Sequence, residues 1–222
     1  MAQYLAASGV GHLHLLDNDK VELSNLPRQI LFNANDIGVD KVKVAANKLQ
    51  QRNQDCQIAA HPIRLTSDNY QALFNQITPQ LLFDCCDNFA TRQLINRIAI
   101  ERQIPLFSAA ISADEGQWFA YAPLSDDKQA FTTNISPYGC YHCVFPADSQ
   151  LSQSCSQMGV LGPAVGVMAS IQALAGINYI IGRQVEFGVL HRLDAKYLSW
   201  SKAKMSLDQQ CRVCRKAFIS AQ

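Results

Sequence analysis

Four of the eight cysteines have the spacing of metal ligands, in two pairs with two residues between the members: Cys140 with Cys143, and Cys211 with Cys214. Two thiolates at this spacing can bind one ion, and two such pairs complete a tetrahedral structural zinc site. Because 67 residues, 144–210, separate the pairs, the site is predicted to join two distant segments and to leave no open position for catalysis. We interpret His142, inside the first pair, as a bystander.

A polar segment after the first predicted strand has the residue types of a nucleotide site. Asp17, at the carboxyl end of that strand, can accept ribose hydroxyl groups. Arg28 can donate a forked pair of hydrogen bonds to phosphate oxygens, with Ser24 and Asn25 beside it. Lys41, thirteen residues after Arg28, begins a predicted helix, and its ammonium group could reach the same phosphates. Taken singly, each of these charges is also typical of a solvated surface.

A second polar stretch, Asp84-Cys-Cys-Asp-Asn88, follows another short apolar strand. A carboxylate at a strand end can hold Mg²⁺, and Asn88 can contact a base or a phosphate. Asp87 has an equally good alternative as a helix N-cap, a position that aspartate favours. We interpret the adjacent Cys85 and Cys86 as buried residues at the strand end.

Short apolar segments alternate with segments of helical spacing over the first half of the chain. This alternation predicts an α/β fold with a Rossmann-like, mostly parallel sheet and helices on both faces. Two later strands joined at a turn predict an antiparallel extension. The expected strands are 12–16, 57–63, 81–84, 105–111 and 117–122, and the expected helices are 2–8, 41–52, 67–76 and 89–102.

The segment 159–182 is almost entirely apolar. Its length would suit a membrane span, but it lacks flanking basic residues and aromatic belts, and Pro163 stands at a natural first helical position. We therefore expect a helix that is buried all round or shared with a second subunit. A closing hairpin is expected from strands 188–193 and 195–200, with its turn about Asp194.

Composition limits the class of protein. With 222 residues and 48% hydrophobic residues, the chain suits one large domain with a full core. The net charge is +1, so nucleic acid and anionic membranes are not expected partners. The first residues lack the pattern of a signal peptide, and cysteine pairs outside a secreted protein favour metal or catalysis over disulfides. The expected location is the cytoplasm.

The motifs in this order resemble the ThiF/MoeB/HesA family, the bacterial relatives of ubiquitin-activating enzymes, over essentially the whole chain. Three segments are most similar to ThiF: Phe89-Ala-Thr-Arg-Gln93, Cys140-Tyr-His-Cys-Val-Phe-Pro146 and Gly159–Met168. The motifs that carry the family resemblance are Asp17-x-Asp19, Leu23-Ser-Asn-Leu-x-Arg-Gln29, Lys41, Asp84-Cys-x-Asp-Asn-x-x-x-Arg92 and the two Cys-x-x-Cys pairs.

The resemblance implies an adenylation reaction. The family binds ATP with Mg²⁺ and attaches AMP to the carboxyl-terminal glycine of a small ubiquitin-like sulfur carrier, releasing pyrophosphate. A ThiS-like carrier in thiamine thiazole synthesis is the preferred substrate, and a MoeB-like role in molybdopterin synthesis is the alternative. By similarity, Asp17 would hold the ribose, Asn25 and Arg28 would act on the phosphates, Lys41 would stabilise the transition state, and Asp87 would bind Mg²⁺.

The resemblance also concerns the carboxyl-terminal third, residues 139–222, of a single adenylation domain spanning 1–222. This part is expected to carry the zinc site, a mobile loop and a helix of the kind used for homodimers. In ThiF-like proteins a cysteine at the place of Cys155 can form an acyl disulfide with the carrier, with sulfur from a donor such as a cysteine desulfurase. The alternative for Cys155 is an ordinary surface thiol.

The sequence departs from the family pattern at its start. The family opens with a strand and a Gly-x-Gly-Gly-x-Gly loop that binds the triphosphate, and an upstream arginine that reaches across the dimer; this sequence shows neither. Three explanations are open: an amino-terminal truncation, a start assigned too far downstream, or a natural remnant. In each case we expect an unpaired sheet centre and weak or no activity for the chain as given. The alternative function is a non-enzymatic, zinc-stapled module for dimerisation or carrier binding.

Overall fold

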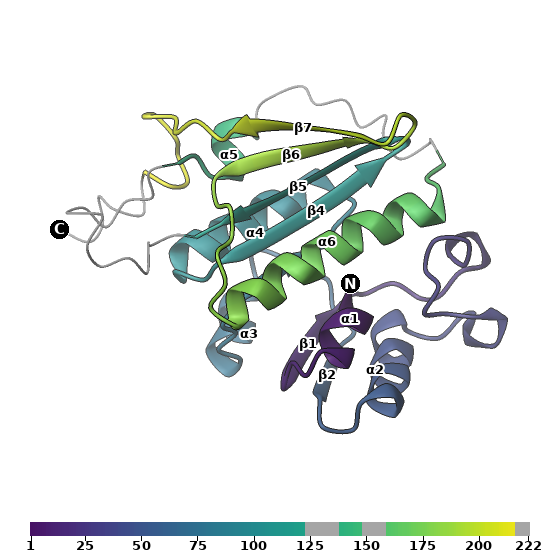
Figure 1. Cartoon of the computed structure of the whole chain (residues 1–222). Helices are drawn as coiled ribbons and strands as arrows, with labels where there is room; N and C mark the ends of the chain where they lie inside the picture. Colours follow the sequence, from purple (N-terminus) through teal and green to yellow (C-terminus); the bar gives the residue numbers. More distant parts are fainter. Residues whose placement is uncertain (123–137, 148–158, 216–222) are drawn as a thin grey trace.

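The computed structural model describes residues 1–122, 138–147 and 159–215 and arranges them in an α/β fold (Figure 1). The strands are β1 (His12–Leu16), β2 (Gln57–His61), β3 (Leu82–Asp84), β4 (Leu106–Ser112), β5 (Glu115–Tyr121), β6 (Val189–Asp194) and β7 (Ser199–Lys204). The helices are α1 (Ala2–Ala7), α2 (Lys41–Arg52), α3 (Tyr70–Gln76), α4 (Phe89–Glu101), α5 (Tyr141–Val144) and α6 (Gly162–Ile180), with 3₁₀ turns at Leu23–Asn25 and Ala34–Asp36.

The described strands form two sheets. β1 and β2 are a parallel pair, and the second sheet has the order β3-β4-β5-β6-β7, in which only β3 and β4 are parallel. The α/β class and the antiparallel extension are confirmed. β4–β5 and β6–β7 are the two expected hairpins. Because β5 also pairs antiparallel with β6, they form one sheet whose antiparallel part is larger than its parallel part. No pairing joins β1 to β3 in the described part of the chain.

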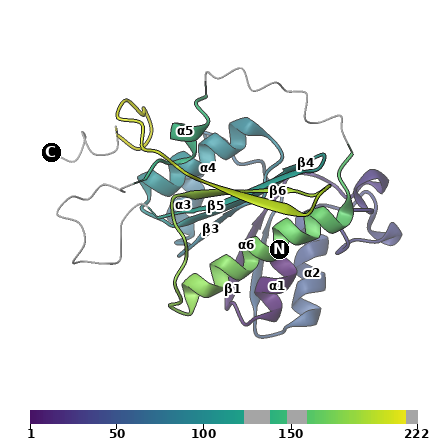
Figure 2. The ribbon, with the colours of Figure 1, turned by 45° about the horizontal axis from the view of Figure 1, so that its top comes forward.

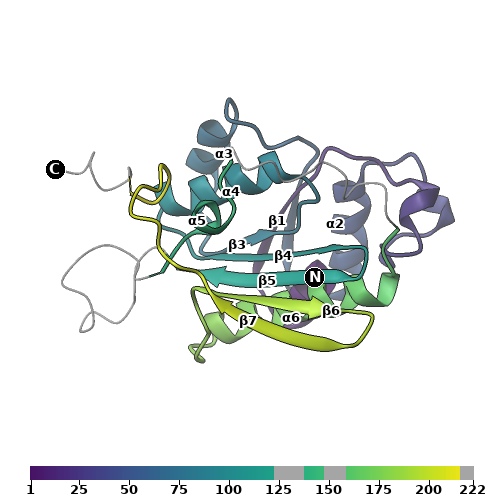
Figure 3. The same cartoon turned by 90° about the horizontal axis from the view of Figure 1, so that it is seen from above.

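Helices cover both faces of the five-stranded sheet, as Figures 1 and 3 show. Alternate residues of a strand point to opposite faces. Leu106 and Tyr121, cross-strand partners, therefore lie on one face in the cluster that includes α4. Phe107 and Ala120, the next pair, lie on the other face and pack against Ala175 of α6. Cover on both faces explains why consecutive residues are buried in the first part of β4, 106–109, and in the last part of β5, 119–121.

The two-stranded sheet has its own small core on one face. Ala6 of α1 and Leu49 of α2 are fully buried there against Leu13 and Ile58, and Figure 2 shows both helices beside β1. Gly9, which ends the α1 segment, has φ of 87°, a left-handed conformation that glycine commonly adopts after a helix. Burial against α2 explains why so short a helix forms.

Helix α6 confirms the predicted apolar helix, but it is not buried all round. It is long and apolar enough to cross a membrane by length and composition alone. One side packs on β4 and β5 through residues that include Met168 and Ala175. Val167, Leu174 and Ile180 remain exposed. The structure thus describes a core helix with an uncovered apolar side.

The position of the last strand corrects the sequence prediction. The expected second strand of the hairpin, 195–200, is mostly turn, and β7 spans Ser199–Lys204 instead. The reason lies in Asp194, whose Oδ1 accepts hydrogen bonds from the backbone of Lys196 (3.0 Å) and Tyr197 (3.1 Å). This side-chain cap favours a longer turn than one centred on the aspartate itself.

Candidate functional site

A cleft of about 3040 Å³ lies between the two sheets and is lined by parts of α1, β1, β3 and α6. Four separate segments of the predicted nucleotide site contribute residues to the lining of this cleft. Ser24 is the predicted nucleotide-site residue that does not line the cleft, although its neighbour Asn25 does. The predicted site residues in the lining are Asp17, Asn25, Arg28, Lys41, Asp87 and Asn88.

The loop after β1 links the acidic residues to the start of α2. Asp17 Oδ1 accepts a hydrogen bond from the backbone of Asp19 (2.8 Å), and Asp19 Oδ2 lies 3.0 Å from Nζ of Lys41. The Lys41 side chain is only 11% exposed, so the pairing fixes its ammonium group in place. Burial raises the pKa of Asp17, and the charge of Asp87 raises it further while Lys41 opposes the change. These three groups are therefore close enough to influence one another's charge.

The segment 22–29 presents Arg28 and Asn25 on a tight turn that begins with a 3₁₀ helix. The Arg28 guanidinium donates to the Ser24 carbonyl (2.8 Å). Asn25 is buried, and its Oδ1 has no hydrogen-bond partner among the described residues. A buried acceptor of this kind is costly unless something donates to it. A bound ligand can supply that donor.

The first residue of α6 holds this segment closely. A Cβ atom at Gly162 would lie 2.3 Å from the carbonyl oxygen of Pro27, a separation that real structures do not allow. Only glycine therefore lets α6 begin against the residue next to Arg28. The predicted dimer-type helix and the predicted phosphate-binding segment are thus in direct contact.

A buried polar network fixes the end of β3. The carboxylate of Asp84 is fully buried and accepts from Nε of Arg92 (3.0 Å), Oγ of Ser108 (2.7 Å) and the backbone of Cys86 (2.9 Å). Arg92 also donates to the Cys86 carbonyl. The protein itself thus occupies both oxygens of Asp84, so Asp84 is a structural group and not a metal ligand.

Asp87 and Asn88, in the loop after β3, have different roles, which the sequence alone did not decide. Asn88 is the N-cap of α4, and its Oδ1 accepts from the backbone of Thr91 (2.9 Å). The alternative in which Asp87 caps the helix is therefore wrong, because Asn88 occupies that position. Asp87 is exposed on the loop and lines the cleft. Cys85 is exposed and Cys86 half-buried, so the prediction that both are buried is also wrong.

Gln172 of α6 is a residue that the sequence reasoning did not assign. Its amide donates to the carbonyl of Asp84 (2.8 Å) and to that of Phe107 (3.0 Å), and its Oε1 lies 3.3 Å from Sγ of Cys85. The signal that the sequence did offer is a glutamine inside an otherwise apolar segment. Gln172 is 2% exposed in the structure, and a buried amide needs several hydrogen-bond partners. Its partners could not be read from the sequence, because Gln172 lies 88 residues from Asp84.

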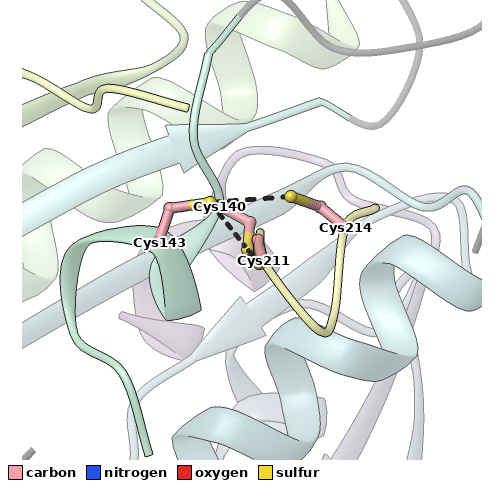
Figure 4. A group of neighbouring side chains, drawn as sticks. All are labelled: Cys140, Cys143, Cys211 and Cys214. Carbon is pink, nitrogen blue, oxygen red and sulfur yellow. Dashed lines mark hydrogen bonds between the residues drawn. The ribbon is translucent and has the colours of Figure 1, made fainter. Parts of the chain in front are cut away.

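The four paired cysteines converge on one point (Figure 4). Their sulfur atoms all lie within 4.8 Å of one another, with separations of 3.8 Å for Cys140–Cys143 and Cys140–Cys211 and 3.5 Å for Cys143–Cys214. Four sulfurs bound to one zinc ion at about 2.3 Å would be about 3.8 Å apart. The cluster can therefore hold a tetrahedrally coordinated metal ion.

The four thiols share hydrogen bonds that affect their ionisation unequally. The hydrogen bond with Cys140 is the main cause that lowers the pKa of both Cys143 and Cys211, whereas the hydrogen bonds with the other cysteines raise the pKa of Cys140, and the pKa of Cys214 is raised as well. The fully buried Asn96 donates to Sγ of Cys140 (3.6 Å) and accepts from the backbone of Tyr141 (3.0 Å). A hydrogen-bond partner such as Asn96 orients a side chain that binds a metal directly.

Two further sequence predictions concern single residues near this cluster. His142 lies 3.1 Å from Oε1 of Gln93 through its Nδ1 and is not a member of the metal-ligand group found among the described residues. This agrees with its interpretation as a bystander. Cys155 lies outside the described residues, as does the whole segment 148–158 that was predicted to be its loop.

Comparison with known proteins gives consistent matches. A model of the ThiF family matches residues 1–213. The chain is 37% identical to the sulfur carrier protein ThiS adenylyltransferase of Escherichia coli, covering 96% of this chain and 80% of that protein. It is 33% identical to the sulfur carrier protein adenylyltransferase of Thermus thermophilus, covering 96% and 76%.

Two further matches extend this picture. An adenylyltransferase and sulfurtransferase MOCS3 of Culex quinquefasciatus is 35% identical, and the chain spans 44% of its length. The crystal structure of E. coli MccB with ATP superimposes with a TM-score of 0.77 over 96% of this chain and 62% of that one. Because the identity to MccB is 21%, this likeness supports the fold alone.

Proposed function

The chain belongs to the ThiF family, and from that premise we propose that it is an ATP-dependent adenylyltransferase of a ubiquitin-like sulfur carrier. The substrate would be the carboxyl-terminal glycine of a ThiS-like protein, in thiamine thiazole synthesis. The 37% identity to a ThiS adenylyltransferase supports this choice. The observation that carries the proposal is a cleft whose lining includes two cationic and two acidic residues: Arg28, Lys41, Asp17 and Asp87.

The proposed reaction needs no protein nucleophile. A carboxylate oxygen of the terminal glycine attacks the α-phosphorus of ATP, the bond between the α- and β-phosphates breaks, and pyrophosphate leaves with its electron pair. The negative charge on the phosphate oxygens grows or shifts during this step, so fixed cations lower the barrier. Lys41, held by Asp19, and Arg28 would supply them, while Asp17 would hold the ribose and Asn25 would contact the phosphates.

Mg²⁺ would bind at Asp87, the carboxylate of the β3–α4 loop that the protein leaves exposed to the cleft. When bound, the ion neutralises phosphate charge and orients the leaving pyrophosphate. Ser24 and Asn88 complete the proposed nucleotide site from its edges. Asn88 already uses its Oδ1 as a helix cap, so its side-chain NH₂ group is the part that would contact nucleotide.

The metal of the cysteine cluster would be Zn²⁺, because four thiolates in tetrahedral positions favour zinc and leave no coordination site open. We assign it a structural role: it would join the α5 segment to the end of the chain after β7.

A homodimer is proposed from the uncovered apolar side of α6. Leu161, Val167, Leu174, Ile180 and Ile181 are exposed on or beside this helix, and burying them against a second copy would remove apolar surface from water. The helix would then connect the dimer to the site through Gly162 and Gln172.

Sulfur transfer after adenylation would use Cys155, joined to the carrier by an acyl disulfide, with sulfur from a donor such as a cysteine desulfurase. We place the protein in the cytoplasm, the compartment in which free thiols persist.

The test is exchange of labelled pyrophosphate into ATP by the purified, zinc-loaded chain with Mg²⁺ and a ThiS-like carrier ending in Gly-Gly. We expect carrier-dependent exchange that is lost in Arg28→Ala and Asp87→Ala. Arg183→Ala and Asp68→Ala are matched controls, because both residues are exposed and lie outside the cleft lining, and they should retain exchange.

Two results would change the assignment. Exchange only with a molybdopterin-synthase carrier would favour the MoeB-like alternative, which the MOCS3 relatives support. Carrier binding without exchange by folded protein would contradict enzymatic activity of this chain and favour the binding module.

A further inference from the structure

Three of the five histidines lie on one face of the two-stranded sheet, near the cleft but apart from the proposed nucleotide contacts. His12 and His14 are two residues apart on β1, so they point to the same side. His61 ends β2 and is paired in register with Leu16, which places it on that side as well. The opposite side, with Leu13 and Ile58, is the one covered by α1 and α2.

Two of these imidazoles are in direct contact. Nδ1 of His14 lies 3.1 Å from Nε2 of His61, and the rings are stacked with centroids 5.4 Å apart and an angle of 26° between them. Two nitrogens bound to one Zn²⁺ at about 2.0–2.1 Å with tetrahedral angles are about 3.3 Å apart. The observed separation is therefore close to that of two ligands of one ion.

We propose that His14 Nδ1 and His61 Nε2 bind one divalent transition-metal ion of the Zn²⁺ type, with His12 as the third ligand from the same face. Among the described residues the three rings do not already lie together as a metal-ligand group. His12 is exposed, and its ring would have to rotate toward the ion on binding. Three imidazoles leave the fourth tetrahedral position to water. This site is separate from the cysteine cluster and differs from it in ligand chemistry.

The electrostatics of the face are compatible with ion binding. Desolvation lowers the pKa of His14, and the neighbouring His61 and His12 lower it further. The neutral imidazole is the form that binds metal.

The position of the site gives it a structural consequence. A two-stranded sheet is marginal by itself, and the ion would link β1 to β2 at their carboxyl ends. The backbone of Asp17 donates to the carbonyl of His61 (3.3 Å) immediately beyond it. Metal binding would therefore stabilise the strand ends that present Asp17 to the cleft.

The experiment loads the full chain with one Zn²⁺ in the cysteine cluster, removes excess metal, and titrates Zn²⁺ calorimetrically. We expect one further ion per chain and a rise in the melting temperature. His14→Gln and His61→Gln should each weaken this second site at least about tenfold, and His12→Gln should weaken it as well. His142→Gln is the control, because it removes an imidazole elsewhere and should leave both sites intact.

No further uptake of Zn²⁺ by the zinc-loaded wild-type chain, or a second site unchanged in His14→Gln and His61→Gln, would overturn the proposal. An unchanged affinity in His12→Gln would overturn the assignment of the third ligand. Nitrogen NMR of the wild-type protein gives a check that needs no variant. On adding Zn²⁺, the shifted atoms should be Nδ1 of His14 and Nε2 of His61, and shifts confined to His142 or His191 would contradict the site.

Discussion

Replacement of Arg92 by methionine tests the buried network that holds the β3–α4 loop. The guanidinium is 10% exposed and its partner Asp84 is 0% exposed, so the change leaves a carboxylate in the interior without its cation. Removing one member of a buried ion pair costs about 3–5 kcal/mol. Because Ser108 and the backbone of Cys86 still donate to Asp84, we expect the lower end, about 3 kcal/mol of unfolding free energy.

The assay is urea unfolding of wild type and variants, with the slope m checked for constancy. Arg97→Met on the same helix is the matched control: its ion pair with Glu101 is long, at 3.6 Å, and both side chains are 40% exposed. Such a pair contributes about 0.3–0.5 kcal/mol. A loss below about 1 kcal/mol in Arg92→Met, no larger than in Arg97→Met, would refute the claim that this pair organises the loop.

Three other predictions follow from particular contacts. Gly162→Ala should disturb the 24–29 segment and reduce pyrophosphate exchange, because the new Cβ would clash with Pro27. Gly166→Ala is the control: a Cβ there has nothing within 4 Å, so exchange should be unchanged and α6 should be stabilised by up to about 1 kcal/mol. Equal effects of the two variants on exchange would contradict the proposed contact. Removing metal from the cysteine cluster with a chelator, or Cys140→Ser, should lower the melting temperature, and an unchanged melting curve would exclude a stabilising metal there. Burial raises the folded-state pKa of Asp17 above its ordinary 3.8, so the stability linked to this group falls as pH rises from 3.8 through the raised pKa. Asp17→Asn should therefore be at least as stable as wild type at pH 7, should have no advantage below about pH 3.8, and should lose exchange. An Asn variant that is less stable than wild type at pH 7 would contradict the direction of the shift.

Local patterns in the sequence were enough to predict much of the fold. The apolar spacing of α2 predicted its bounds, Lys41–Arg52, and the short apolar segment 12–16 predicted β1, His12–Leu16. These signals depend on neighbours in sequence, so they can be read without tertiary contacts. The last hairpin was misplaced because one side-chain cap, that of Asp194, decides the length of the turn.

In the candidate site, too, local sequence patterns predicted some features, whereas others depend on tertiary contacts. The spacing of Cys140, Cys143, Cys211 and Cys214 predicted a metal cluster, and their sulfurs do converge. The roles within the Asp84–Asn88 stretch could not be separated from sequence, because burial makes Asp84 structural while Asn88 takes the cap and leaves Asp87 exposed. Gln172 lies 88 residues from its partner Asp84 in the sequence, and His14 lies 47 residues from His61. No local sequence pattern specifies these long-range contacts.

The most direct test of the central claim is the mass of the carrier after incubation with this chain and MgATP. The proposed function predicts that a ThiS-like carrier gains one AMP at its terminal glycine, that added pyrophosphate reverses the gain, and that a carrier lacking this glycine stays unmodified. A carrier that binds the folded, zinc-loaded chain but keeps its original mass would contradict adenylation by this protein.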